Sequence, residues 1–346
     1  MSRCEKLCEF ITDVEAVYIS SYPNIFYYSG FTSEDARLII TKKRRILFTD
    51  SRYTIQAKIQ AKYFEIYDIS NDFKKVINQL GIETLCFEED NITVSQFEKL
   101  KNLSVELKPF SKHIKKPRAL KDREELLKIA EAQRLGCDAF SYIINFIKEG
   151  KTEKEIALEL EFFMKENGAS ALSFETICAS GERSAMPHGV ASDKIIEKGD
   201  FLTLDFGCVL DGYYSDMTRT IVIGNASERQ KEIYNVVKKA QSAALETLKP
   251  GIKCSDVDIA ARNIITDAGY GEYFGHGTGH GVGIEIHETP SLSPKSDEVL
   301  CVGNVVTVEP GIYIEGFGGV RIEDLVQITA EKPQNLTKTG KELLII

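Results

Sequence analysis

Residues 201–223 read FLTLDFGCVLDGYYSDMTRTIVI, and this stretch decides the fold. Leu202, Leu204 and Phe206 alternate with smaller or more polar residues, the period of two that is typical of a strand with one apolar face. Residues 218–223 are mostly β-branched and predict a return strand. The Asp-Gly pair between the two runs indicates a tight turn, so the stretch predicts a β-hairpin.

Two acids lie on opposite arms of this hairpin. If the turn is centred near Leu210 and Asp211, Asp205 and Asp216 are expected to face each other directly across the strands, about 4.5–5.5 Å apart. Two carboxylates at that separation repel each other and must share a proton or hold a cation. An ordinary hairpin with solvated acids is the alternative that these residues alone leave open.

The composition is that of an ordinary globular protein. A chain of 346 residues predicts two domains. The net charge of −9, with lysine and arginine interspersed among acids, argues against a nucleic-acid or membrane partner. The eight cysteines form no CxxC pair, which favours a reducing compartment. Because no apolar leader or run of about 18 apolar residues is present, a cytoplasmic protein is expected.

Residues 1–117 predict a small α/β domain because short strand and helix patterns alternate along them. A basic stretch with two prolines, 108–118, is interpreted as the connection to a second domain over 118–346. Strands are expected at 16–20, 38–41, 45–49, 84–87 and 104–107, and helices at 52–62 and 71–80.

The second domain is expected to be α+β with two related halves. Capping-box patterns at 122–125, 152–155 and 227–230 each predict the start of a helix. The order of helix, helix, strand and hairpin then occurs twice, with the second strand at 283–287 and the second hairpin over 305–328. Glu309 and Glu323 lie on the two arms of that hairpin, as the two aspartates do on the first.

A pseudo-symmetric pair of hairpins would bring four carboxylates together. Such a cluster cannot stay ionised in a protein interior without positive charge, and two divalent cations would supply it. Dinuclear hydrolases use this arrangement, with a shared water that becomes hydroxide near neutral pH. Oxygen ligands with one imidazole favour Mn²⁺, with Co²⁺, Zn²⁺ or Fe²⁺ as alternatives.

The imidazole is expected from the glycine-rich stretch 275–290, which holds His276, His280 and His287. Its glycines allow the backbone to approach a ligand closely. Their spacing never satisfies GxGxxG, which excludes a dinucleotide fingerprint, and His287-Glu-Thr-Pro is not HExxH. One metal-bound imidazole and two hydrogen-bonding ones would suit amide hydrolysis.

Six motifs stand along the second domain: MPHG at 186–189, LDFG at 204–207, YSDMTRT at 214–220, GHGVGIEIHE at 279–288, VEPGIY at 308–313 and VRIED at 320–324. With these motifs the chain resembles the M24 metallopeptidases, the pita-bread family of methionine aminopeptidases, aminopeptidase P and prolidase. The resemblance spans residues 120–346. Residues 24–32 and 49–53 are similar to the creatinase-like N-terminal domain of the proline-specific branch.

The resemblance implies a role for each candidate residue. Asp205, Asp216, His280, Glu309 and Glu323 would bind two divalent ions, with Glu309 also acting as general base. His276 and His287 would bind the substrate carbonyl, and His188 would orient the scissile peptide. Tyr313 is expected to line the proline pocket and Arg321 to support the acids. Arg219 is expected either to support the acids, as Arg321 does, or to form a structural ion pair.

The expected function is that of a dinuclear aminopeptidase that hydrolyses the N-terminal Xaa-Pro bond of peptides with a metal-bridging hydroxide. The first alternative is an Xaa-Pro dipeptidase, or prolidase. A non-catalytic pita-bread peptide-binding protein and a metal-free amidinohydrolase are further alternatives, disfavoured because all five ligand positions are present. The resemblance also implies a homodimer.

Overall fold

The computed structural model describes residues 2–70 and 72–346. The chain forms two compact units, which divide between Arg118 and Ala119. None of the helices in the described ranges is both long and apolar enough to span a bilayer.

The N-terminal unit is built on one mixed sheet with strand order β4-β3-β2-β1-β5-β6. The strands β1 and β3 pair antiparallel with β2, and the remaining neighbours pair in parallel. Its strands are β1 Glu15–Ile19, β2 Ala36–Ile40, β3 Arg45–Thr49, β4 Glu65–Asp68, β5 Thr84–Phe87 and β6 Glu106–Pro109. Its helices are α1 Arg3–Cys8, α2 Tyr22–Ser29, α3 Thr54–Gln60, α4 Phe73–Gln79, α5 Val94–Lys101 and α6 Ser111–Ala119.

The predicted α/β character of this unit is confirmed. The stretch 108–118, expected as the connection to the second domain, contains the end of β6 and most of α6, with Pro117 inside the helix. The helix α2 was not predicted, since its apolar residues include three tyrosines and its start is marked only by Pro23. Residue 71, at the start of the expected helix 71–80, lies outside the described residues.

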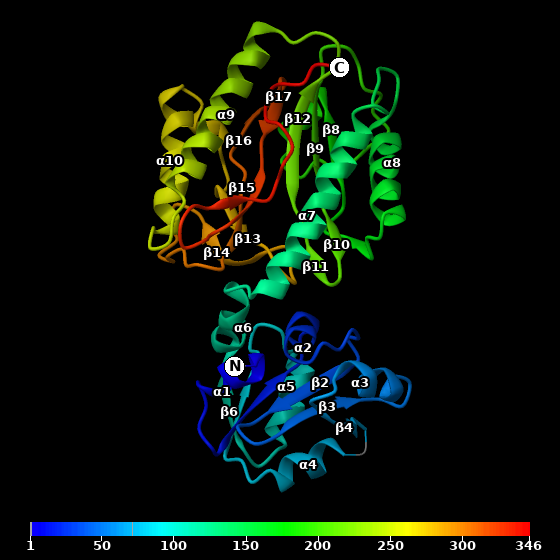
Figure 1. Ribbon diagram of the computed structural model, residues 1–346, viewed down its shortest axis with the longest axis vertical. Coiled ribbons are helices and arrows are strands. Elements are labelled where there is room, and N and C mark those ends of the chain that lie inside the picture. Colours follow the sequence, from blue (N-terminus) through cyan, green and yellow to red (C-terminus); the bar gives the residue numbers. More distant parts are fainter. Residues whose placement is uncertain (1, 71) are drawn as a thin grey trace. The chain divides into compact units, whose positions relative to one another are not determined.

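The C-terminal unit has two halves with the same order of elements (Figure 1). In each half a pair of helices lies beside a sheet that contains a hairpin. Each half also has its own apolar core. The first half comprises α7 Arg123–Ile143, α8 Glu153–Glu166, β7 Ala171–Leu172, β8 Ile177–Ser180, β9 Phe201–Phe206, β10 Cys208–Leu210, β11 Tyr213–Tyr214 and β12 Met217–Val222. The second comprises α9 Glu228–Thr247, α10 Cys254–Asp267, β13 Gly279–Gly281, β14 Glu288–Leu292, β15 Val305–Val308, β16 Gly311–Ile314, β17 Gly318–Arg321, β18 Asp324–Gln327 and β19 Gln334–Asn335.

The three predicted capping boxes are all present. The side chains of Asp122, Thr152 and Ser227 each accept the amide of the residue three positions on, and that residue's side chain accepts the cap's own amide. Because two orphan amide donors are satisfied reciprocally, each pattern fixes where its helix begins. The strand expected at 283–287 was wrong: strands run over β13 and β14 on either side of it.

The first hairpin turns one residue later than expected, which shifts the pairing of its strands by two residues. Its turn is at Asp211 and Gly212, both with positive φ, as a tight Asp-Gly turn requires. Asp205 therefore pairs with Thr218 and does not directly oppose Asp216. In this register the two aspartates are diagonal neighbours on one face of the sheet, so the predicted proximity comes from a diagonal pair.

The second hairpin is interrupted at the position of its acids. The ladder of β15 with β18 and the ladder of β16 with β17 have the same register, which places Glu309 opposite Glu323 in the gap between them. The halves meet here, because the Glu323 amide donates to the Thr218 carbonyl at 3.1 Å. The predicted two-domain fold with pseudo-two-fold halves is thereby confirmed.

Gly207 separates β9 from β10 at a point of close backbone approach. A Cβ on this residue would lie 2.0 Å from the Ser215 carbonyl oxygen. We expect Gly207→Ala to lower the free energy of unfolding by about 3 kcal/mol in a denaturant titration, because the hairpin must shift to accept the methyl group. Gly340→Ala, where a Cβ would meet nothing within 4 Å, is the control and should change it by less than about 1 kcal/mol. Equal stability of the two variants would contradict this account.

Candidate active site

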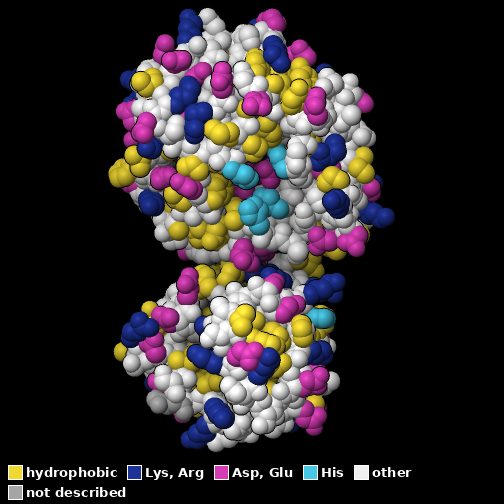
Figure 2. Space-filling view, turned by 180° about the vertical axis from the view of Figure 1, so that it is seen from behind, with side chains coloured by type: hydrophobic (Ala, Val, Ile, Leu, Met, Phe, Trp, Pro, Cys, Tyr) yellow, Lys and Arg dark blue, Asp and Glu magenta, His cyan; other side chains and the backbone are white. Residues whose placement is uncertain are grey.

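A cavity of about 710 Å³ lies between the two hairpins of the C-terminal unit. Figure 2 shows histidine side chains gathered around a hollow in this unit, with acidic atoms visible between them. All ten residues expected at the site line this cavity: His188, Asp205, Asp216, His276, His280, His287, Glu309, Tyr313, Arg321 and Glu323.

The four acids reach the cavity from four different segments. Asp205 lies on β9, Asp216 directly precedes β12, Glu309 follows β15, and Glu323 lies between β17 and β18. Ligand atoms of Asp216, His280 and Glu323 all lie within 4.8 Å of one another, a spacing at which one cation contacts all three. The Nε2 atom of His280 is 3.3 Å from Glu309 Oε1 and 3.6 Å from Asp216 Oδ2.

Arg321 is the buried cation that holds this cluster from one side. Its Nη2 donates to Asp205 Oδ2 at 2.5 Å and its Nε to Thr218 Oγ1 at 3.1 Å. The Thr218 hydroxyl in turn donates to Glu323 Oε2 at 2.7 Å. Arg321 and Thr218 therefore fix one oxygen of an acid from each half.

The site holds more negative charge than its own cations balance. Burial raises the pKa of Asp216 and Glu323 well above the ordinary value, and repulsion from the neighbouring carboxylates adds to it. The pKa of Asp205 is raised by burial despite Arg321. Burial would also raise the pKa of Glu309, but the hydrogen bond and charge of His280 lower it to about 2. These groups are thus suited to additional positive charge.

The donor set fits divalent metal ions. Asp205 Oδ1 is buried and has no hydrogen-bond partner, although unpaired buried oxygens of this kind are rare. Four carboxylates and one imidazole are ligands that first-row divalent ions such as Mn²⁺ accept. The Nδ1 of His280 lies 3.1 Å from the Gly281 carbonyl, to which it can only donate, so Nε2 is the ring nitrogen that would bind a metal ion after losing the proton that Glu309 accepts here.

His276 is held in one tautomer by a similar contact. Its Nδ1 lies 2.8 Å from the Gly277 carbonyl, and its Nε2 lies 2.9 Å from the Tyr313 hydroxyl. Arg321 Nη1 donates to the same hydroxyl at 2.7 Å. Burial lowers the pKa of His276, so the neutral ring accepts the Tyr313 proton and the three side chains form a chain of hydrogen bonds.

The remaining two histidines are exposed on the cavity wall. His188 follows a short 3₁₀ turn at Gly181–Ala185, and His287 stacks edge-on against His280 at 4.3 Å between ring centroids. The cavity wall also includes the apolar residues Phe174, Ile177 and Val190. A polar reaction centre with an adjoining apolar wall is typical of a small-molecule or peptide site.

Two residues that shape the site were not singled out from the sequence. Thr218 lies two residues after Asp216, and this period of two was the signal that its side chain shares a face with the acids. Glu153 lies far from the site in sequence, and its buried carboxylate accepts four bonds from the amides and hydroxyls of Ser180 and Ser192, the residues that flank the His188 loop. No local pattern signals such a contact.

Comparison with known families gives two matches that together cover most of the chain. The model of metallopeptidase family M24 matches residues 127–330, and the model of the creatinase/prolidase N-terminal domain matches residues 3–120.

Individual relatives match over nearly their whole length. The chain is 42% identical to an Xaa-Pro dipeptidase of Pyrococcus furiosus, covering 99% of both chains. Among solved structures it is similar to an Xaa-Pro dipeptidase from Bacillus anthracis, with 44% identity, a TM-score of 0.96 and 99% of each chain covered. An X-Pro aminopeptidase from Thermotoga maritima matches with 38% identity, a TM-score of 0.93 and complete coverage of both chains.

The raised pKa values of the acids predict how pH affects protein stripped of divalent ions. A carboxyl with a raised folded pKa contributes stability that is present below its unfolded pKa, about 4, and is lost as pH rises through the folded value. We expect the thermal unfolding midpoint to fall with rising pH above about 4 more steeply in the wild type than in Glu323→Gln, whose amide cannot ionise.

The control is Glu315→Gln, which removes an exposed acid from the turn of the same hairpin. The unfolding midpoint of Glu315→Gln should change with pH as that of the wild type does, and addition of Mn²⁺ should make the midpoints of these two proteins less dependent on pH. A Glu323→Gln profile parallel to the wild-type one would show that the acids do not repel each other.

Proposed function

The chain belongs to metallopeptidase family M24, and we propose that it hydrolyses the peptide bond between a first residue and proline, with Xaa-Pro dipeptides as its preferred substrates. The observation that carries this proposal is the single cavity in which four acids, four histidines, a tyrosine and an arginine meet. The class of metallopeptidase follows from the family, whereas the choice of substrate is inferred.

The comparisons favour the dipeptidase over the aminopeptidase that was expected first. Relatives named as Xaa-Pro dipeptidases match at 42–44% identity over 99% of the chain, and the named aminopeptidase matches at 38%. The aminopeptidase remains the second candidate, because glycine and not a bulky or charged residue stands on each side of His276 in the sequence. The two differ only in whether residues after proline are accepted.

We assign the metal ligands to Asp205, Asp216, His280, Glu309 and Glu323, with two divalent ions per chain and Mn²⁺ as the preferred ion. When bound, the two ions supply Lewis acidity and lower the pKa of a water shared between them. The support for this assignment is the unpaired Asp205 Oδ1, the raised pKa values of Asp216 and Glu323, and the position of His280 Nε2, 3.3 Å from Glu309 and 3.6 Å from Asp216.

The other cavity residues are assigned to substrate and proton handling. Glu309 faces the cavity beside His280 and is placed to take the proton of the attacking water. His276 and His287 would bind the substrate carbonyl and stabilise the negative charge that develops on it, while His188 orients the peptide. Tyr313 would line the proline pocket, and Arg321 holds both the Tyr313 hydroxyl and Asp205 in place.

We also propose that the protein is a cytoplasmic homodimer. All eight cysteines are free, which suits a reducing compartment. Ile55, Ile59 and Tyr63, on and just after α3, are 63–84% exposed, and apolar side chains grouped in this way are typical of an interface. Sedimentation equilibrium would give twice the chain mass of 38.7 kDa if the proposal is right, and the single mass if it is wrong.

A peptide-length series distinguishes the two candidate functions. With Mn²⁺ present, we expect kcat/KM for an Xaa-Pro dipeptide to exceed that for the matching Xaa-Pro-Yaa tripeptide by at least about tenfold, since a dipeptidase site excludes residues after proline. An Xaa-Ala dipeptide is the control for proline specificity. Faster cleavage of the tripeptide would support the aminopeptidase, and cleavage of neither peptide would refute both.

Replacing single ligands tests the assigned roles. Asp216→Asn and Glu323→Gln should each lower kcat by at least about a hundredfold, because both remove a charge from the proposed ion site. The N-terminal unit should stay folded, as judged by circular dichroism. Near wild-type turnover of either variant with Mn²⁺ would show that the ligand assignment is wrong.

A further inference from the structure

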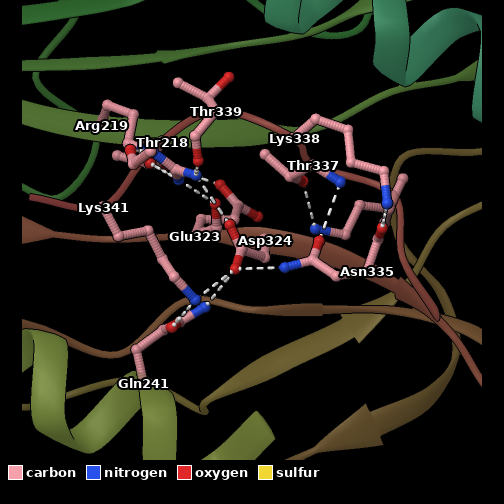
Figure 3. Close-up of polar contacts among 12 residues, drawn as sticks. Thr218, Arg219, Gln241, Glu323, Asp324, Asn335, Thr337, Lys338, Thr339 and Lys341 are labelled. Atoms are coloured by element: carbon pink, nitrogen blue, oxygen red, sulfur yellow. Dashed lines mark hydrogen bonds and ion pairs between the residues drawn. The ribbon is translucent and has the colours of Figure 1, made fainter. Parts of the chain in front are cut away.

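A buried polar cluster surrounds Asp324, the residue that directly follows Glu323 (Figure 3). Its centre is an ion pair between Arg219 of β12 and Asp324 of β18, with 2.8 Å from Nη2 to Oδ1. Both side chains are almost completely buried, at 2% and 0% exposure, and neither lines the cavity. An ion pair buried this deeply requires partners for its remaining donors and acceptors.

Arg219 uses its remaining donors on backbone carbonyls of three segments. Its Nη1 donates to the Thr218 carbonyl at 2.9 Å and also to the carbonyl of Glu323. Its Nε and Nη2 donate to Gly340 at 3.0 Å and Thr339 at 2.8 Å. One guanidinium therefore joins both hairpins to residues 335–341, which we call the C-terminal segment.

Both carboxylate oxygens of Asp324 accept hydrogen bonds. Its Oδ2 accepts hydrogen bonds from Gln241 Nε2 at 2.9 Å, Asn335 Nδ2 at 2.8 Å and Lys341 Nζ at 2.9 Å. Two of these donors belong to the C-terminal segment. Asp324 directly follows Glu323, so its anchorage also fixes the backbone from which Glu323 projects.

Thr337 supplies a second link between the halves. Its hydroxyl accepts the Leu325 amide at 2.8 Å and Gln133 Nε2 at 2.9 Å. Gln133, on α7, also forms two hydrogen bonds with the backbone of Asp216. Its Nε2 donates to the Asp216 carbonyl at 2.9 Å, and its Oε1 accepts a hydrogen bond from the Asp216 amide at 3.0 Å. The Thr337 hydroxyl therefore connects Gln133, which binds the backbone of Asp216, to Leu325, which lies two residues after Glu323.

We infer that Arg219 and Thr337 are positioning residues, through which the C-terminal segment fixes the spacing between Asp216 and Glu323. This inference rests on the proposed role of those two acids as metal ligands. Arg219 then combines the two roles expected for it. It supports the acids by binding the backbone carbonyls of Thr218 and Glu323, and it forms a structural ion pair with Asp324.

The physical reason is that ion binding tolerates little error in ligand spacing. Asp216 and Glu323 come from different halves, and only contacts that span both halves can set the distance between their backbones. Outer contacts of this kind typically change metal affinity or activity by 10–100-fold when they are removed. The C-terminal segment would therefore act on the affinity for the ions without touching the substrate.

A matched pair of substitutions tests the inference. Thr337→Val removes the hydroxyl that links the halves, whereas Thr339→Val makes the same chemical change two residues later, where the hydroxyl is buried without a hydrogen-bond partner. Thr337→Ser restores the hydroxyl, and Arg219→Lys keeps the charge but loses the fork that reaches three segments. The readouts are the Kd for Mn²⁺ by calorimetry on metal-stripped protein, and kcat and KM with saturating Mn²⁺.

We expect Thr337→Val and Arg219→Lys to weaken Mn²⁺ binding by about tenfold or more, with KM unchanged, and Thr339→Val and Thr337→Ser to bind as the wild type does. Wild-type Mn²⁺ affinity in folded Thr337→Val and Arg219→Lys would overturn the inference. If Thr337→Val does not fold, Arg219→Lys alone decides.

The outcome is separable from that of the proposed function. If the wild type binds Mn²⁺ but cleaves no Xaa-Pro peptide, the substrate proposal fails while the affinity ratios still test the positioning role. If the wild type cleaves such peptides and all variants bind Mn²⁺ equally, only the positioning role is wrong.

Discussion

The mutual repulsion of four buried carboxylates is the constraint on which the C-terminal unit depends. Asp205, Asp216, Glu309 and Glu323 converge on one cavity, and among the described residues that line it Arg321 is the only arginine or lysine. Arg321 pairs with Asp205 and, through Thr218, with Glu323, but the pKa values of Asp216 and Glu323 remain raised. A fold that brings these groups together must supply both a rigid frame and further positive charge.

The frame is made by the two hairpins and by the contacts that join them. Each hairpin contributes its acids from opposite arms, and the register of each decides which side chains share a face. The Glu323 amide bonds the Thr218 carbonyl, and Arg219 bonds the carbonyls of both residues, so the halves cannot move apart without breaking buried hydrogen bonds. The rigidity of the cluster therefore comes from backbone contacts behind the site as much as from side chains inside it.

Much of this arrangement is predictable from sequence because local chemistry encodes it. The capping boxes at Asp122, Thr152 and Ser227 place three helices, and the residue types of the site predict a cluster of acids and histidines. The turn of the first hairpin lies one residue later than expected, at Asp211 and Gly212, and this shifts the strand pairing by two residues. The hydrogen bond between Gln133 and Thr337 could not be predicted, because these two residues lie 204 positions apart and neither belongs to a local pattern.

The central claim is that acids from both halves hold two divalent ions in this cavity. Anomalous diffraction at the manganese edge, from crystals soaked in Mn²⁺, tests it most directly. The account predicts two peaks between Asp205, Asp216, Glu309 and Glu323, about 3.5–4 Å apart, with His280 beside one of them. A map with no peak in this cavity, or with manganese bound only elsewhere on the chain, would contradict it.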